Sequence, residues 1–200
     1  MEFDVVVKKR KSVRSYESKK ANWKQILEAI DSANQTPFAG NYNHLKFLII
    51  EKKETIREIA NICDQLWLNG IGILIVVCSD DSHLEDIYGD RGRIYSRQQA
   101  GAAIQTLLLK LTDLGLDSCW IGSYNDAEIK KELDIPVKIQ IEAIIPAGYE
   151  KGNSPKKIKR DLDTTIFWEK WSQNRRPTKF EESKQDYFPI ENAIKAKKKI

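Results

Sequence analysis

The stretch "ILIVVC", residues 73–78, decides the fold class of this 200-residue chain. It is an unbroken apolar run rich in Ile and Val, and no polar residue marks a face that water would cover. Such a run is typical of a central strand that is buried on both faces of its sheet. The sequence therefore predicts a domain in which other elements cover a sheet centred on residues 73–78.

The pattern of apolar residues changes repeatedly on both sides of this strand. Apolar residues at helical spacing predict a helix over residues 23–33, with Asn22 as its N-cap and Gln25 at the capping-box position. Residues 97–114 predict a longer helix that ends at Gly115. The alternation of helices and strands indicates an α/β or α+β fold with a central sheet. The other expected elements are helices over 56–66 and 126–133 and strands over 45–50, 118–122 and 139–149.

The composition is that of one globular domain with a mild positive charge. Hydrophobic residues make up 41% of the chain, enough for a substantial core, and the formal net charge is +4. Because lysines are interleaved with glutamates, we expect no nucleic-acid partner. No apolar run approaches the roughly 20 residues of a membrane span, and the N-terminus lacks a signal-peptide pattern. We therefore expect no membrane partner and a soluble, cytoplasmic protein.

The cysteines and histidines favour neither a metal centre nor a disulfide framework. The three cysteines lie far apart in apolar segments, which suits reduced thiols in a core: Cys63, Cys78 and Cys119. With only His44 and His83, and no Cys-x-x-Cys pair, we expect no zinc site. Neither histidine accompanies a nucleophile elbow, and "GIG" at 70–72 lacks the third glycine of a dinucleotide fingerprint. Hydrolysis and Rossmann-type binding therefore have little support.

Two cationic clusters stand at opposite ends of the predicted domain. "RKSVRSY", residues 10–16, carries Arg10, Lys11, Ser12 and Arg14, and guanidinium groups with a nearby hydroxyl suit a phosphate. "PKKIKRDL", residues 155–162, offers a second cationic segment. In an extended stretch its Lys157 and Lys159 point to the same side. The two clusters could close on one phosphate, but on spacing alone a solvated surface is the more common explanation.

The order of motifs resembles the nitroreductase-like FMN-dependent flavoprotein family over roughly residues 5–171. "RKSVRSY" is similar to that family's N-terminal phosphate motif, and "TPFAGNYNHLKFLII" to its A-P-S-x-x-N-x-Q-P-W-x-F segment. "CDQLWLNGIGILIVVCSD" resembles a glutamine-bearing helix before a central strand, and "AAIQTLLLKLTDLGLDSCWIGSY" the long helix and next strand. "IEAIIPAGYEKGNSPKKIKRDLDTTIFWEKW" resembles the last strand, the second phosphate arm and a closing F-x-x-W element.

The resemblance implies an α+β fold, an α/β sandwich in which helices flank a central mixed sheet, with a C-terminal extension. It places a nitroreductase-like FMN-binding domain at 1–171 and the extension at 172–200, where it wraps around a partner or is disordered.

The resemblance also implies which residues hold FMN. Its phosphate is expected on Arg10, Ser12 and Arg14 with help from Lys11, and on Lys157 and Lys159, with Arg160 as the rival of Lys159. Gln65 matches a side chain that hydrogen-bonds the edge of the flavin, and Asn43 stands beside the ring. The segment expected along the isoalloxazine, with the backbone N–H of Gly122 or Ser123 near N5, is Trp120, Ile121, Gly122 and Ser123. No side-chain acid or base is required, so no catalytic residue is predicted.

The activity implied is that of an FMN-dependent oxidoreductase in which NAD(P)H reduces a small conjugated acceptor of the nitroaromatic or quinone type. The family is dimeric, so we expect a homodimer with FMN at the subunit interface. Two alternatives stay open: a specialised member that dehalogenates reductively or consumes flavin, and a non-catalytic flavin-binding protein. The departures from the family pattern fall on the substrate side: Phe38, His44, Ile71, Gly72, Gln99 and Thr106.

Overall fold

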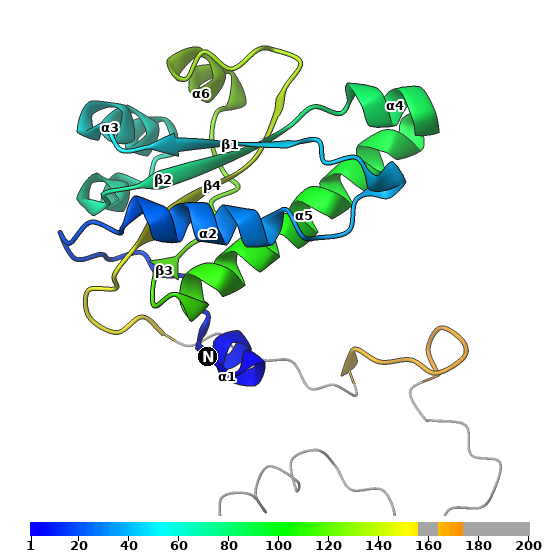
Figure 1. Ribbon diagram of the computed structural model, residues 1–200, viewed down its shortest axis with the longest axis horizontal. Coiled ribbons are helices and arrows are strands. Elements are labelled where there is room, and N and C mark those ends of the chain that lie inside the picture. Colours follow the sequence, from blue (N-terminus) through cyan, green and yellow to red (C-terminus); the bar gives the residue numbers. More distant parts are fainter. Residues whose placement is uncertain (156–163, 174–200) are drawn as a thin grey trace, which may run out of the picture. The chain divides into compact units, whose positions relative to one another are not determined.

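The computed structural model describes residues 1–155 and 164–173, and its main feature is one sheet with the strand order β1-β2-β4-β3 (Figure 1). All paired strands are antiparallel. Within the described residues, the mixed character that we predicted is limited to an isolated parallel bridge between Ser12 and Ser118. The strands are β1 (Leu45–Ile50), β2 (Leu74–Ser79), β3 (Asp117–Ser118) and β4 (Gln140–Gly148).

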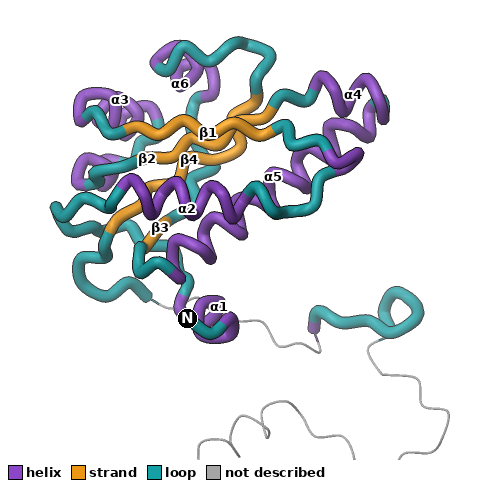
Figure 2. Tube along the Cα trace, in the orientation of Figure 1, coloured by secondary structure: helices purple, strands orange, loops and turns teal. Residues whose placement is uncertain are grey.

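Strand β2 is central and buried on both faces, as the apolar run predicts. Ile73, Ile75 and Val77 belong to a hydrophobic cluster on one face of the sheet, which α2 (Trp23–Ala33) and α5 (Asp90–Asp113) cover. Their alternating neighbours in β2 belong to a second cluster, which α3 (Lys53–Ile62) and α6 (Asp126–Glu132) cover. Figure 2 shows the sheet between these two helical layers. Apolar burial on both faces supplies the main driving force for this arrangement.

The ends of two helices agree with the sequence. Asn22 caps α2 by accepting from the Lys24 N–H, and Gln25 completes the capping box. Helix α5 ends before Gly115, whose φ of 79° lies in the left-handed region that glycine adopts without strain.

Other boundaries differ from the prediction. Helix α3 ends at Ile62 because the chain turns at Asp64, whose φ is 51°, so Gln65 follows the helix and precedes the 3-10 segment Leu66–Gly70. Helix α5 begins at Asp90, seven residues before the predicted start at 97. The predicted strand 118–122 contributes only Ser118 to β3, and Ile121 adds a single bridge to Ile144. Two unpredicted helices are α1 (Phe3–Lys9) and α4 (Ser82–Tyr88).

The chain divides into two compact units, residues 1–156 and 157–200. Within the second unit, the rings of Phe167 and Trp171, from the predicted closing element, lie 4.8 Å apart. The domain boundary predicted at 171 stays a prediction. None of the helices in the described ranges is both long enough and apolar enough to span a bilayer.

Gly92 in α5 is required by a close approach of two backbones. A Cβ at this position would lie 2.3 Å from the carbonyl oxygen of Leu84 in α4, whereas a Cβ at Gly101 in the same helix meets nothing within 4 Å. We expect Gly92→Ala to destabilise the fold by about 1–3 kcal/mol through overpacking. Gly101→Ala should stabilise it by up to about 1 kcal/mol through helix propensity. Urea unfolding of both variants checks this, and equal midpoints would contradict the close contact.

Candidate functional site

The N-terminal cationic segment lies directly beside the segment that follows β3. The Val13 N–H donates to the Ser118 carbonyl at 3.0 Å, and Ser12 forms the parallel bridge with Ser118. Val13 is fully buried, whereas Ser12 and Arg14 on either side of it are exposed. Backbone pairing therefore fixes Ser12 and Arg14 at the edge of the sheet and brings two predicted site segments together.

The cations of this segment differ in what they can bind. Lys11 Nζ lies 2.7 Å from Glu150 Oε2, and both side chains are largely buried. No carboxylate pairs with Arg10 or Arg14 within residues 1–155 and 164–173. The charge of Lys11 is therefore neutralised internally, and the two guanidinium groups are the cations left for an anion.

Ser118 and Cys119, beside the paired residues Ser12 and Val13, are both buried. Burial raises the pKa of the Cys119 thiol, while the positive charges of Arg14 and Arg10 and a hydrogen bond from Ser12 oppose the rise. Both arginines thus act on the pKa of this thiol in the same sense. Ser118 Oγ is buried and has no hydrogen-bond partner among the described residues. An unpaired buried hydroxyl costs free energy, and Ser118 Oγ is not accessible to a ligand in this structure.

The predicted flavin-facing segment extends from this corner along β4. Ile121 is buried and pairs with Ile144, while Trp120 beside it is 40% exposed. Gly122 and Ser123 are exposed, and nothing except the Trp120 ring lies near the space that a Cβ at Gly122 would fill. The segment therefore presents an aromatic side chain and accessible backbone, as a wall along a planar ring requires.

Gln65 is joined to the N-terminal segment through two aromatic residues. Trp67 Nε1 donates to Gln65 Oε1 at 2.6 Å, and the Trp67 ring stacks on Tyr16 with centroids 6.1 Å apart. The Tyr16 hydroxyl donates in turn to the Val13 carbonyl at 2.9 Å. The structure thus brings Gln65 to the same end of the sheet as residues 10–14.

Asn43 does not lie with the other predicted residues. Its side chain donates to Asn34 Oδ1 and accepts from the Leu45 N–H, just before β1. Leu45 lies opposite Ser79 in β2, which lies opposite Gln140 in β4.

The strand register gives the distance between Asn43 and the N-terminal cationic segment. Gln140 is at one end of β4, whereas Ser118 pairs with Ala147 near the other. Seven residues of strand correspond to about 23 Å. Asn43 and Ser12 therefore lie at opposite ends of the sheet of one chain. The other predicted phosphate ligands, Lys157 and Lys159, and their rival Arg160, lie outside the described residues.

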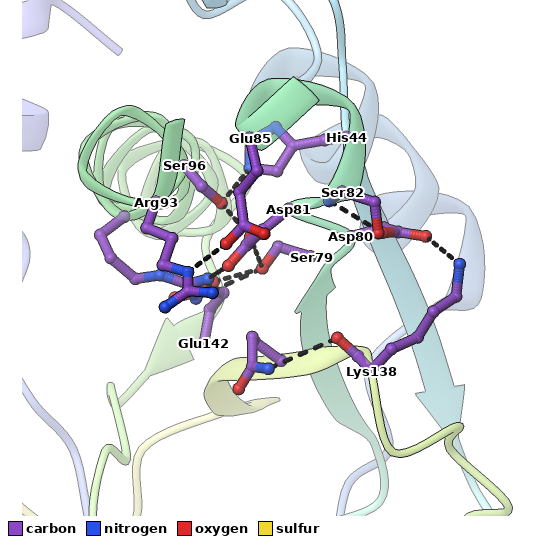
Figure 3. Close-up of polar contacts among 12 residues, drawn as sticks. His44, Ser79, Asp80, Asp81, Ser82, Glu85, Arg93, Ser96, Lys138 and Glu142 are labelled. Atoms are coloured by element: carbon purple, nitrogen blue, oxygen red, sulfur yellow. Dashed lines mark hydrogen bonds and ion pairs between the residues drawn. The ribbon is translucent and has the colours of Figure 1, made fainter. Parts of the chain in front are cut away.

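Sequence reasoning missed a polar network at the Asn43 end of the sheet (Figure 3). Arg97 of α5 forms ion pairs with Asp81, after β2, and with Glu142 of β4. Ser96 donates to Asp81 at 2.5 Å, and Ser79 lies 2.5 Å from Glu142. Of these residues, Asp81, Arg97 and Glu142 border an open cleft of about 690 Å³. Two acidic residues directly after the β2 run are the only signal in the sequence, since the partners come from distant elements.

The Lys11–Glu150 pair predicts a dependence of stability on pH. Burial would raise the pKa of Glu150, but hydrogen bonds from Lys11 and Ser154 lower it to about 2 from its ordinary 4.5. Because the folded state favours the carboxylate, the stabilisation is complete above pH 4.5 and is lost as the pH falls toward 2. Glu150→Gln should therefore unfold more readily than the parent at pH 7, by about 1–3 kcal/mol. Urea titrations should show that the difference in the free energy of unfolding between the parent and Glu150→Gln becomes smaller below pH 4.5. A difference that stays constant with pH would contradict the role of the Lys11–Glu150 pair.

Comparisons with known proteins agree on one family. The Nitroreductase family model matches residues 7–71 and 63–149. The chain is 28% identical over 170 residues to a protein of Methanothermobacter thermautotrophicus provisionally named NADH dehydrogenase/NAD(P)H nitroreductase, covering 82% of this chain and 85% of that one. It is 25% identical over 167 residues to iodotyrosine deiodinase of Thermotoga neapolitana, covering 76% of this chain and 90% of that one.

A solved structure shows the same fold. The FMN-dependent nitroreductase of Clostridium difficile R20291 superposes with a TM-score of 0.69 and 23% identity, covering 83% of this chain and 98% of that one. The family model spans the cationic segment, the central strand and the segment along β4 that the fold brings together. Sequence and fold thus lead to the same conclusion: the chain is an oxidoreductase that belongs to the nitroreductase family.

Proposed function

We propose that this protein is an FMN-dependent oxidoreductase that uses NAD(P)H to reduce a small conjugated acceptor, such as a nitroaromatic compound or a quinone. The observation that carries the proposal is the pairing of residues 12–13 with Ser118. This pairing places Arg10 and Arg14 beside the segment that runs along β4. Neither arginine has a carboxylate partner in the described part of the chain. This arrangement joins an anion site to a wall for a planar ring.

Each part of the site has a distinct role in this proposal. Arg10 and Arg14 bind the phosphate by charge-assisted hydrogen bonds, and Ser12 adds a donor. Trp120 and the backbone N–H groups of Gly122 and Ser123 orient the ring and exclude water from one face. When bound, FMN supplies the hydride and electron transfer, and the protein supplies orientation and charge. The family resemblance supports Lys157 and Lys159 as the second phosphate arm.

The separation of Asn43 from the phosphate segment supports a homodimer with shared sites. If Asn43 contacts a flavin ring, that flavin belongs to the partner subunit, because residues 10–14 of the same chain lie about 23 Å away along the sheet. A two-fold axis would then create two equivalent sites, each built from both chains. We also propose a cytoplasmic location, supported by three free, buried cysteines.

Reductive dehalogenation is the second candidate, and the similarity to the Thermotoga iodotyrosine deiodinase favours it. The two candidates share the cofactor and differ in the acceptor. Reoxidation of the reduced protein by iodotyrosine, compared with a nitroaromatic compound and a quinone, would separate them.

Anaerobic titration with NADH and with NADPH tests the proposal. The purified protein, supplied with FMN, should show flavin absorbance that one or both nicotinamides bleach and that the acceptor restores. A protein that stays colourless after FMN is added and unbound flavin is removed would refute the cofactor. Bound flavin that neither nicotinamide reduces would indicate a non-catalytic flavin-binding protein.

A further inference from the structure

His44, which stands where the family pattern has proline, is buried and joins a hydrogen-bond relay. Its ring is 2% exposed, and Nε2 lies 2.8 Å from Ser96 Oγ of α5. The Ser96 hydroxyl also lies 2.5 Å from Asp81 Oδ1, and Arg97 pairs with the same carboxylate. Figure 3 shows His44, Ser96 and Asp81 in this order.

The relay determines which nitrogen of His44 carries the proton. A serine hydroxyl has one hydrogen, and a carboxylate only accepts, so the hydrogen of Ser96 goes to Asp81. His44 Nε2 must then donate to Ser96, which leaves the lone pair on Nδ1 in the neutral ring. Nδ1 is buried and has no hydrogen-bond partner among the described residues.

His44 also connects the relay to the loop that carries Asn43. The Phe38 ring lies edge-on to the His44 ring at 6.1 Å and packs against the core under α2 and α5. The His44 carbonyl accepts from the Asp80 N–H at 3.2 Å. His44 is therefore one of the contacts that hold residues 38–43 against α5 and the turn after β2, beside the Asn43–Asn34 hydrogen bond and the Tyr42–His83 ring contact.

We propose that His44 is a positioning residue: in its neutral form it fastens residues 38–43 to α5, and protonation of Nδ1 releases them. The added proton would create a buried N–H without an acceptor in the described part of the chain, next to a relay whose carboxylate Arg97 already neutralises. The inference rests on the proposed function in one respect, because Asn43 is then the residue that the loop presents to the flavin ring.

The burial and the charges around His44 favour the neutral form of its ring. Burial lowers its pKa from the ordinary 6.5, and Arg97 acts in the same sense, whereas Asp81, Asp80 and the Ser96 contact oppose it. Since the folded state favours the neutral ring, the contact is fully effective above pH 6.5 and weakens as the pH falls below that value.

Amide hydrogen exchange of the full-length protein as purified tests the proposal. The protection factors of the Asn41, Tyr42 and Leu45 amides, which donate hydrogen bonds at this loop, should fall below pH 6.5, by at most about tenfold per pH unit, while those of β2 stay constant. His44→Gln, whose amide still donates to Ser96 but does not titrate, should keep the loop protected at every pH. His44→Leu, which cannot donate, should leave it open at every pH.

His83→Gln is the matched control. His83 is the only other histidine, and its ring centroid lies 4.2 Å from that of Tyr42 in the same loop. This variant should retain the pH dependence of the parent. Protection that is constant with pH in the parent, or that still falls with pH in His44→Gln, would overturn the proposal.

The outcomes for the loop and for the cofactor are distinguishable. If the loop opens as expected but FMN neither binds nor is reduced, the positioning role stands and the proposed function fails. If FMN binds and is reduced but the loop does not respond to pH, the positioning role fails and the proposed function stands.

Discussion

Replacing Arg14 with alanine should weaken FMN binding by about tenfold to more than a hundredfold, since one charge-assisted contact contributes roughly 1.5–3 kcal/mol. Arg14 is exposed, and none of the ion pairs found in the described residues includes it, so its loss breaks no ion pair of the described fold. The second change, Arg10→Ala in the same chain, should deepen the loss. Fluorescence titration of the FMN-free protein with FMN measures the dissociation constant.

An exposed arginine elsewhere provides the control. Arg57 lies on α3, on the solvent side, and its replacement by alanine removes the same charge without touching the proposed site. The dissociation constant should match the parent within about twofold, and the urea midpoints of both variants should stay near that of the parent. Equal affinities of Arg14→Ala and Arg57→Ala for FMN would remove the phosphate assignment.

The parts of the fold that the sequence predicts are those encoded by neighbouring residues. The run at 73–78 has no solvent-facing position, and the structure buries it on both faces. Asn22 and Gln25 act within one turn of each other, so their capping box is recognisable from the sequence alone. The short helix α4 escapes prediction because it buries only Leu84, which gives no periodicity to detect. The turn at Asp64 escapes it because aspartate adopts a positive φ only when the surrounding structure demands it.

The candidate site likewise contains features that neighbouring residues encode and features that only contacts between distant residues create. The segment "RKSVRSY" carries its chemistry in seven consecutive residues, and its composition alone suggests an anion. That Glu150 neutralises Lys11 depends on a contact between residues 139 positions apart, which only the pairing of distant segments creates. The relay from His44 to Ser96 and Asp81 has the same origin, because it joins the residue before β1, the first third of α5 and the turn after β2. Local motifs therefore indicate where an anion could bind, and the tertiary structure determines which of their cations already has an internal partner.

The position of Asn43 leads to a second prediction with a large effect. Its side chain is exposed, at the opposite end of the sheet from Ser12. If the site is shared between subunits, a bulky side chain at this position blocks the flavin of the partner and leaves the phosphate segment of its own chain intact. Asn43→Trp should therefore prevent FMN binding in a homodimer as completely as the double change Arg10→Ala and Arg14→Ala, although the two alterations lie about 23 Å apart in one chain.

Mixing the two altered chains should restore binding. In a mixed dimer, one site receives both the tryptophan and the arginine-free segment, while the other receives native residues from each chain. Co-expressed chains with different affinity tags, purified through both tags, should bind one FMN per dimer with the parent's affinity, whereas each altered homodimer binds none. Sedimentation should show these species as dimers at micromolar concentration. A mixed dimer without FMN would mean that Asn43 and the arginines of one chain contact the same flavin, which the strand register contradicts. Unimpaired FMN binding by Asn43→Trp alone would mean that Asn43 is not part of the site.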